Sequence, residues 1–227
     1  MDTLKLDNIS TIINSLHTGD IVLFGDPTYW FSRIIMCCTD SPWSHVGIVL
    51  RDPVYIDPKL TGVYLWESGV EDLPDAADSK KKWGIQLVEL EKKIREYDGI
   101  VSVRKLINLN NIPCCTPERN TKLQVIYNTT YNKPYDYNPL NMIFCLLNMS
   151  KMNTRNLNRM FCSAFSSYIY TELGYIDPKT NWSMIEPCQF SSKCSPTLTG
   201  NDWQLIGQNG ELCFINGYTL DPEIKIK

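Results

Sequence analysis

Residues 159–174 read RMFCSAFSSYIYTELG, and this stretch predicts the helix around which the fold is organised. The apolar residues recur at the spacing of one helical face, namely Phe161, Phe165, Tyr168, Ile169 and Leu173. Gly174 is a typical helix stop. We therefore expect a helix over residues 161–173, with Cys162 in its first turn beside the buried stripe.

A thiol at the start of a helix suggests nucleophilic chemistry, because the partial positive charge there and a nearby imidazolium both favour the thiolate. The chain has two histidines, His17 and His45. His45 opens an apolar, β-branched run that predicts a strand over residues 45–50. If the chain is an enzyme, His45 is the expected general base.

A third group must orient the imidazole through its other nitrogen. Glu67 is the best candidate, because it lies on the next predicted strand, residues 63–68. Each of these residues also has a structural explanation when taken alone. Cys162 could be one more buried cysteine, His45 a satisfied core histidine, and Glu67 an acid on an edge strand.

The remaining pattern predicts alternating helices and strands without repeats or linkers. The expected elements are a helix at 8–16, a strand at 20–24, a helix at 28–38, a strand at 84–89, a helix at 90–97, a strand at 99–106, and helices at 117–131 and 140–149. Residues 70–82 and 132–139 are expected loops. We expect a single domain over residues 1–227, with a core of about 16–175 and an extension, 176–227, that wraps it.

Composition excludes several classes of protein. The 227 residues carry a net charge of −3, with 43% hydrophobic and 21% charged residues, so no basic surface for nucleic acid is expected. The only basic run, Lys80 to Lys82, is expected in a solvated loop. The apolar stretches 34–38 and 142–147 are too short to cross a bilayer and predict core helices. The N-terminal residues lack the pattern of a secretory signal, which favours an intracellular, cytoplasmic protein with reduced thiols.

Nine cysteines are present, and their spacing decides how they are interpreted. Residues 37–38 and 114–115 are adjacent pairs, and no two cysteines have the two-residue spacing of a zinc clamp. We therefore expect no metal, and predict that most of the cysteines other than Cys162 are small buried hydrophobic residues.

Five motifs in sequence order resemble the NlpC/P60 superfamily. They are HTGDIVL (17–23), SHVGIV (44–49), WES (66–68), PYD (134–136) and FCSAF (161–165). The order resembles the circularly permuted branch, in particular the YiiX/YaeF-like permuted papain-fold amidases, a group that includes poxvirus and other large-DNA-virus members. The resemblance covers about residues 16–175. It implies an α+β fold in which an antiparallel sheet or small barrel packs against the helix that bears the cysteine.

The resemblance also implies roles for individual residues. Cys162 is implied as the nucleophile, His45 as the base and Glu67 as the orienting residue, whereas Asp20 belongs to a structural motif. Further candidates for a substrate or oxyanion contact are Tyr135 and Ser163. Relatives often carry Glu where this chain has Ala164, which leaves the substrate preference open.

The implied reaction is cleavage of an amide or isopeptide bond through a thioester, without a cofactor. The substrate would be a peptide or an acyl-amide, belonging to a protein or a lipid. One alternative is a thiol acyltransferase or phospholipase acting on lipid esters. Another is a catalytically silent structural or virion-associated protein of the same fold. The oligomeric state is left open, and a virus-encoded protein would act in the host cytoplasm or the virion.

Overall fold

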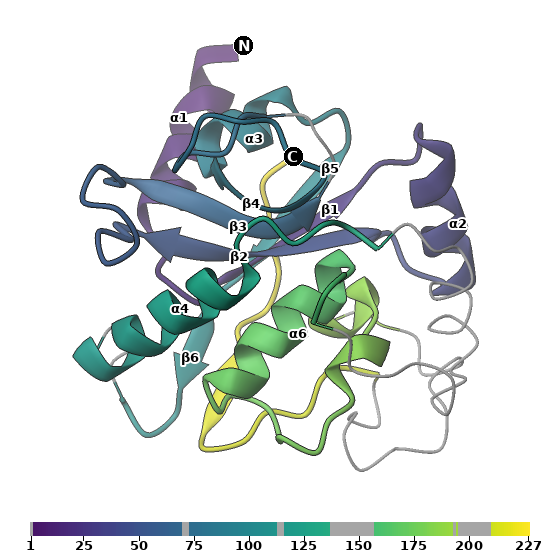
Figure 1. Ribbon diagram of the computed structural model, residues 1–227. Coiled ribbons are helices and arrows are strands. Elements are labelled where there is room, and N and C mark those ends of the chain that lie inside the picture. Colours follow the sequence, from purple (N-terminus) through teal and green to yellow (C-terminus); the bar gives the residue numbers. More distant parts are fainter. Residues whose placement is uncertain (1, 70–72, 113–115, 137–156, 193, 195–209) are drawn as a thin grey trace.

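A six-stranded antiparallel sheet forms the centre of the computed structural model, which describes residues 2–69, 73–112, 116–136, 157–192, 194 and 210–227. The strand order is β4-β3-β2-β1-β5-β8 (Figure 1). The strands are β1 (Ile21–Gly25), β2 (His45–Arg51), β3 (Val63–Gly69), β4 (Gly84–Glu89), β5 (Ile100–Arg104) and β8 (Ile224–Lys225). The predicted α+β class, with an antiparallel sheet packed against the helix that bears Cys162, is confirmed.

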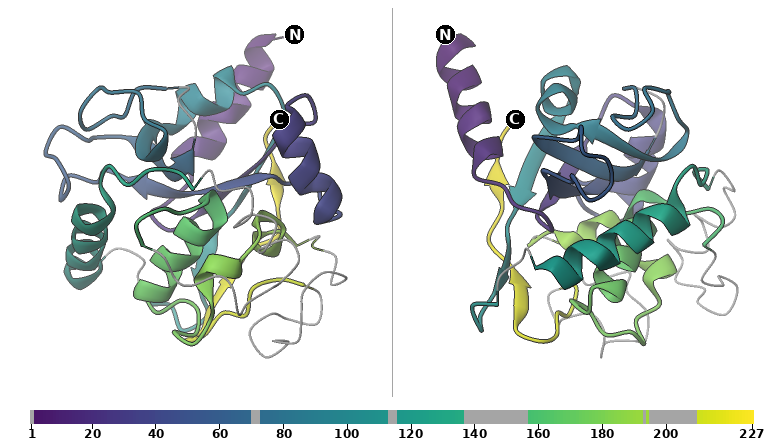
Figure 2. Two further views of the ribbon diagram at one scale, coloured as in Figure 1. Left: turned by 45° about the vertical axis from the view of Figure 1, so that its right-hand side comes forward. Right: turned by 60° about the vertical axis from the view of Figure 1, so that its left-hand side comes forward.

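Helices cover both faces of this sheet, because its inner strands are apolar on both sides. In β1, Ile21 and Leu23 face one core and Val22 and Phe24 face the other, as the period of two requires. Helices α1 (Asp2–Asn14) and α3 (Leu90–Glu96) lie on one face, and α4 (Pro117–Thr130) and α6 (Cys162–Glu172) lie on the other (Figure 1). Figure 2 shows β8 running beside α1.

Helix α6 is buried around its whole circumference from Cys162 to Tyr170, whereas the sequence predicted a single buried stripe. Trp66 of β3 packs edge-on against Phe165, with ring centroids 5.1 Å apart. The other sides are covered by the short helices η1 (Trp182–Met184) and η2 (Pro187–Phe190). These C-terminal contacts hide the serines of the helix, so amphipathicity alone underestimated its burial.

The predicted strand at 99–106 divides after Arg104. Residues from Leu106 onward form β6 (Leu106–Asn108), which pairs with β7 (Tyr218–Leu220) in a separate two-stranded sheet. The buried Arg104 guanidinium donates to the carbonyl oxygens of Phe190, Leu220 and Asp221, and it pairs with Glu211. These long-range contacts cannot be read from local sequence, and they explain the division of the strand.

Two other segments differ from expectation. Helix α2 (Trp30–Cys38) is not a core helix, because Ile34 is 41% exposed and Cys37 is exposed. Helix α1 begins well before residue 8. The helix predicted at 140–149 lies outside the described residues.

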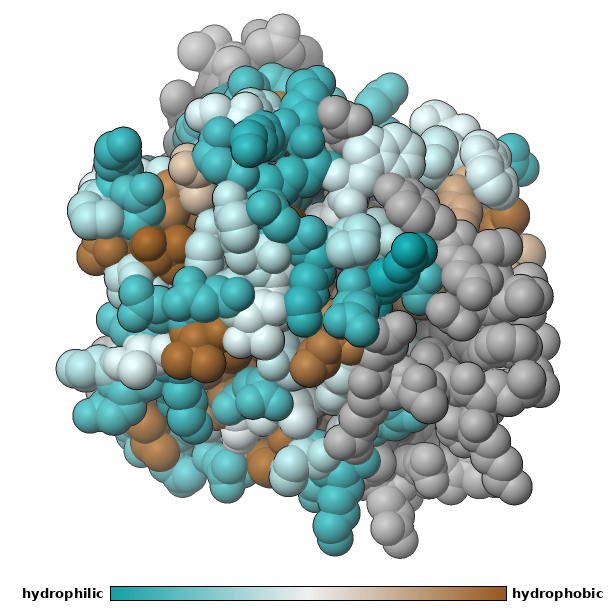
Figure 3. All heavy atoms as spheres, viewed as in Figure 1, coloured by the Kyte–Doolittle hydropathy of each residue, from teal (hydrophilic) through white to brown (hydrophobic). Residues whose placement is uncertain are grey.

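The surface carries small apolar patches rather than one large apolar face on the side seen in Figure 3, where most described residues are hydrophilic or neutral. The helices of the described residues include none with the length and hydropathy of a membrane span.

Thr116 caps α4 by accepting a hydrogen bond from the Arg119 N–H, with Pro117 at the first helical position, as predicted.

The packing of α6 on β3 predicts a large loss of stability for Phe165→Ala. The ring is fully buried against Trp66, so its removal leaves a cavity and should cost about 3–5 kcal/mol of the free energy of unfolding, measured in urea. Val125→Ala, at a position 59% exposed on α4, is the control and should change the free energy by less than about 0.5 kcal/mol. Equal losses in the two variants would contradict this packing.

Candidate active site

The structure brings together the three residues that the sequence singled out. His45 is the first residue of β2, Glu67 lies in β3, and Cys162 is the first residue of α6. His45 Nε2 lies 2.5 Å from Glu67 Oε2, and Cys162 is the other ionisable neighbour that acts on the His45 ring. Because Nε2 binds Glu67, Nδ1 is the ring nitrogen left for the thiol. The three side chains therefore form one continuous series.

The alternation of side chains along β3 explains how it serves both the site and the core. Trp66 and Ser68 point to the α6 face, where the Ser68 hydroxyl donates to the Met160 carbonyl at 2.7 Å. This contact fixes the chain two residues before Cys162. Glu67, between them in sequence, points to the opposite face. One short strand thus positions the start of α6 and the carboxylate that binds His45.

Glu67 is completely buried, and its carboxylate is held from three elements. Oε2 binds His45, while Oε1 accepts hydrogen bonds from Gln86 of β4 at 2.9 Å and Lys93 of α3 at 3.0 Å. Burial favours the neutral acid, but the charges of Lys93 and His45 outweigh it and hold the pKa of Glu67 well below its ordinary value. Glu67 is therefore ionised at neutral pH.

The charge state of His45 follows from its two neighbours. Burial disfavours the imidazolium, but the negative charges of Cys162 and Glu67 outweigh burial and raise the pKa of His45 to about 10. Phe24 packs against the ring, with centroids 5.6 Å apart. At neutral pH the ring is therefore an imidazolium beside Cys162.

Two glycines leave room for the Glu67 side chain. A Cβ on Gly47 would lie 2.6 Å from Leu65 Cδ1 and 3.2 Å from Glu67 Cβ. A Cβ on Gly69 would lie 3.2 Å from the carboxylate carbon of Glu67. The glycine of the SHVG motif is therefore explained by a close approach between β2 and β3.

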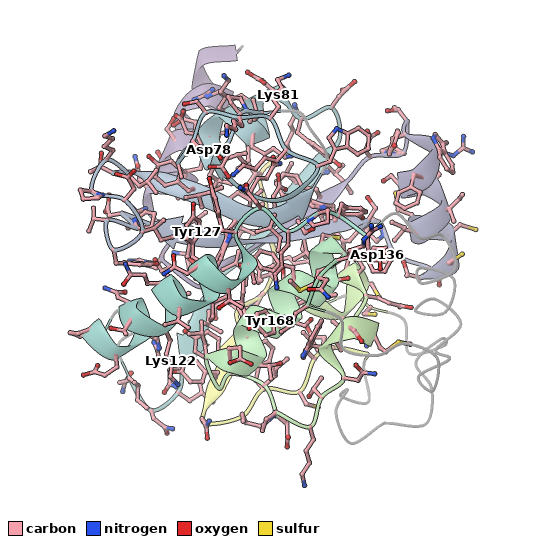
Figure 4. All side chains as sticks on the ribbon, in the orientation of Figure 1. Asp78, Lys81, Lys122, Tyr127, Asp136 and Tyr168 are labelled. Carbon is pink, nitrogen blue, oxygen red and sulfur yellow. The ribbon has the colours of Figure 1, made fainter. Side chains whose placement is uncertain are left out.

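Tyr135 lies beside the cysteine. Its backbone bridges to Met160 and donates to the Trp83 carbonyl, and its ring packs edge-on against Phe161. Burial, and secondly the negative charge of Cys162, raise the pKa of Tyr135 well above its ordinary value, so the phenol stays protonated. Asp136, also buried, lies near the end of α6 that is closest to α2, and Tyr168 lies further along the helix (Figure 4).

Ser163 and Asp20 occupy different surroundings. Ser163 is the second residue of α6 and is buried, so its backbone N–H belongs to the first helical turn, where no intrahelical acceptor exists. The Asp20 carboxylate accepts hydrogen bonds from the backbone N–H groups of His17 and Leu106, at 2.7 and 2.9 Å. Asp20 thus connects the start of β1 to β6, and these contacts are structural.

Sequence reasoning missed Lys93 and Gln86. Lys93 lies in the charged segment LEKKIRE, which was interpreted only as a short charged helix. However, Leu90, Lys93 and Ile94 follow the spacing of one helical face, and all three are buried. A lysine on an apolar stripe was the available signal. Gln86, at the register position opposite Glu67, had no signal in the sequence.

Five of the other cysteines lie among the described residues, and they differ in exposure, whereas Cys114, Cys115 and Cys145 lie outside the described residues. Cys188 and Cys194 are buried, whereas Cys37 is exposed and Cys38 and Cys213 are intermediate. In the part of the chain that the structure describes, no group of three or more His, Cys, Asp or Glu side chains could hold a metal ion.

The chain is similar to known proteins by sequence and by structure, but no family model matches it. An uncharacterized protein of Acanthamoeba polyphaga mimivirus is 33% identical over 107 residues, which cover 41% of this chain and 39% of the viral protein. The chain thus matches about two-fifths of the length of that relative. Among solved structures, the metalloprotein YiiX of Escherichia coli O157:H7 is similar with a TM-score of 0.44 and 21% identity, covering 70% of this chain and 66% of YiiX.

The close approach at Gly47 predicts the effect of Gly47→Ala. The added methyl group must displace Leu65 or Glu67, which should cost about 1–3 kcal/mol of the free energy of unfolding. Leu65→Ala removes the nearest obstacle, so the double variant should be more stable than the sum of the two single losses by at least about 0.5 kcal/mol. Strict additivity in urea unfolding would show that the two positions do not touch.

Proposed function

We propose that this chain is a cysteine hydrolase that cleaves an amide or isopeptide bond through a thioester acyl-enzyme. The observation that carries the proposal is the series Cys162–His45–Glu67, with the thiol at the first residue of α6. The resemblance of five ordered motifs to permuted NlpC/P60 amidases points in the same direction. A silent protein of this fold would be expected to have an apolar gap between the cysteine and the histidine.

In the proposed acylation step, the Cys162 thiolate attacks the carbonyl carbon of the substrate. The carbonyl π electrons move to oxygen, and the oxyanion accepts hydrogen bonds from the N–H groups at the start of α6 and from the Tyr135 hydroxyl. The His45 imidazolium then gives its proton to the leaving amine as the C–N bond breaks. The thioester remains on Cys162 and neutral His45 remains beside it.

In the proposed deacylation step, His45 takes a proton from water, which attacks the thioester carbonyl. The C–S bond breaks, the acid product leaves, and the thiolate–imidazolium pair is restored. Throughout both steps Glu67 keeps the ring oriented through Nε2 and stabilises its positive charge. The reaction needs no further cofactor.

An amide substrate fits this arrangement better than a lipid ester, because an amine must be protonated as it leaves and His45 is an imidazolium at neutral pH. The substrate class proposed is a peptide or an acyl-amide carried by a protein or a lipid. Acyl transfer to or from lipid esters is the rival reaction, and the same acyl-enzyme would form in it.

The proposal predicts that Cys162→Ala abolishes turnover. Wild type and variant are compared on matched panels of peptides, isopeptides and lipid esters, and the acyl group on Cys162 is detected by mass spectrometry. The loss should be at least about 10³-fold, because the nucleophile itself is removed. Cys37→Ala, at an exposed cysteine, should retain wild-type rates. Turnover that survives Cys162→Ala would falsify the mechanism, and turnover of esters alone would favour the lipid reaction.

The proposed oxyanion contact predicts a distinct effect for Tyr135→Phe. Removal of one donor should lower kcat by about 10²–10³-fold. Alkylation of Cys162 by iodoacetamide has no oxyanion intermediate, so its rate should stay near that of wild type. Ser163→Ala keeps the backbone N–H and should have a much smaller effect on kcat. If Tyr135→Phe slows alkylation as much as turnover, Tyr135 is holding the site together rather than binding the oxyanion.

A further inference from the structure

The site continues one residue beyond the cysteine, histidine and glutamate. On the α3 side of the sheet, Lys93 Nζ lies 3.0 Å from Glu67 Oε1 and forms a buried ion pair with it. Four ionisable groups therefore follow one another in the order Cys162, His45, Glu67 and Lys93. His45 and Lys93 bind different oxygens of the Glu67 carboxylate.

Charge counting shows why the fourth member matters. In the thiolate–imidazolium form, the first three groups carry −1, +1 and −1, which leaves a net charge of −1 in a site where Glu67 is fully buried. Lys93 brings the sum to zero. A net charge in a desolvated site is unfavourable, so a protein without Lys93 can lower its free energy by keeping the thiol protonated.

The location of Lys93 restricts what it can do. Its side chain is 7% exposed, and it shares the buried face of α3 with Leu90 and Ile94. The neighbouring charges on α3 are engaged elsewhere, since Arg95 pairs with Glu91. Lys93 binds Oε1 of Glu67, whereas His45 binds Oε2, so the carboxylate connects the lysine to the histidine.

We propose that Lys93 is a positioning residue that acts through Glu67, and that its positive charge makes the Cys162–His45 pair exist as thiolate and imidazolium. This inference rests on the proposed function, because it concerns the activation of the same nucleophile. It goes beyond that function by adding a charged group from α3 that the reaction requires without contacting the substrate.

The ionisable groups that bear on the pair come from several elements. They are His45 on β2, Glu67 on β3, Lys93 on α3, Cys162 on α6, and Tyr135 and Asp136 in the segment after α4. Tyr135 stays neutral, and Gln86 of β4 is a neutral donor to the same Glu67 oxygen as Lys93. Gln86 and Lys93 thus differ in charge while sharing one acceptor, which provides a matched control.

The experiment measures the rate of iodoacetamide alkylation at Cys162, by peptide mass spectrometry, between about pH 4 and pH 10. Lys93→Gln can keep a hydrogen bond to Glu67 but loses the charge, so the midpoint of the profile should rise by about one pH unit or more. Below that midpoint, alkylation should be about tenfold slower than in wild type. Lys93→Arg keeps the charge and should restore the wild-type midpoint.

Gln86→Met removes the neutral donor. It should move the midpoint of the alkylation profile by less than half of the shift caused by Lys93→Gln. The inference is overturned if Lys93→Gln leaves the midpoint in place, or if Gln86→Met shifts it equally. Circular dichroism and thermal melting establish that each variant is folded. If Lys93→Gln does not fold, the double variant Lys93→Gln/Glu67→Gln is compared with Glu67→Gln. Because residue 67 is then neutral in both proteins, loss of the lysine should not change the midpoint of the alkylation profile. A difference of about one pH unit between the two midpoints would refute action through Glu67.

The wild-type profile separates this inference from the proposed function. If wild-type Cys162 is alkylated no faster than Cys37 at neutral pH, the nucleophile itself is not activated and the hydrolase proposal fails. If wild-type Cys162 reacts selectively but is insensitive to Lys93→Gln, the hydrolase proposal stands and only the role of Lys93 is rejected.

Discussion

A buried, ionised carboxylate is the constraint on which the rest of this structure depends. Glu67 has no contact with solvent, and an ion in such a place is tolerated only when hydrogen bonds and opposite charge replace the lost water. Its donors come from β2, β4 and α3, so these elements must lie at fixed distances from β3. Gly69 lacks a side chain where the carboxylate lies, and Gly47 lacks one where Leu65 and the Cβ of Glu67 approach β2.

The same strand links this polar network to the apolar core. Trp66 and Ser68 face α6 and hold its first turn, while Glu67 faces α3. A change in the pleat of β3 would therefore disturb the thiol and the carboxylate together. Geometry of this kind suits nucleophilic catalysis, in which a misplacement of about 1 Å between reacting groups can cost a large factor in rate. Among the described residues, the three side chains come from β2, β3 and α6, and the segment around Tyr135 bridges to Met160 just before α6.

Much of the fold could be predicted from the sequence, because its strands are apolar runs bounded by turns and its nucleophile starts a helix. Cys162, His45 and Glu67 were found by residue type, order and resemblance. Lys93 and Gln86 were not: the position of Lys93 on the stripe of Leu90 and Ile94 was the one local signal, whereas its partner Glu67 and the role of Gln86 cannot be read from local sequence. The burial of α6 on all sides was also missed, because η1 and η2 come from later in the chain. Local sequence patterns cannot identify contacts between residues that are far apart in the sequence.

The order of the elements along the chain also determines when the site is complete during synthesis. Residues 21–104 include strands β1 to β5 and helix α3, and they contain His45, Glu67, Gln86 and Lys93. The thiol of Cys162 follows more than fifty residues later. A growing chain therefore holds these four residues while it still lacks the thiol, and it cannot carry out the proposed reaction until Cys162 has been added.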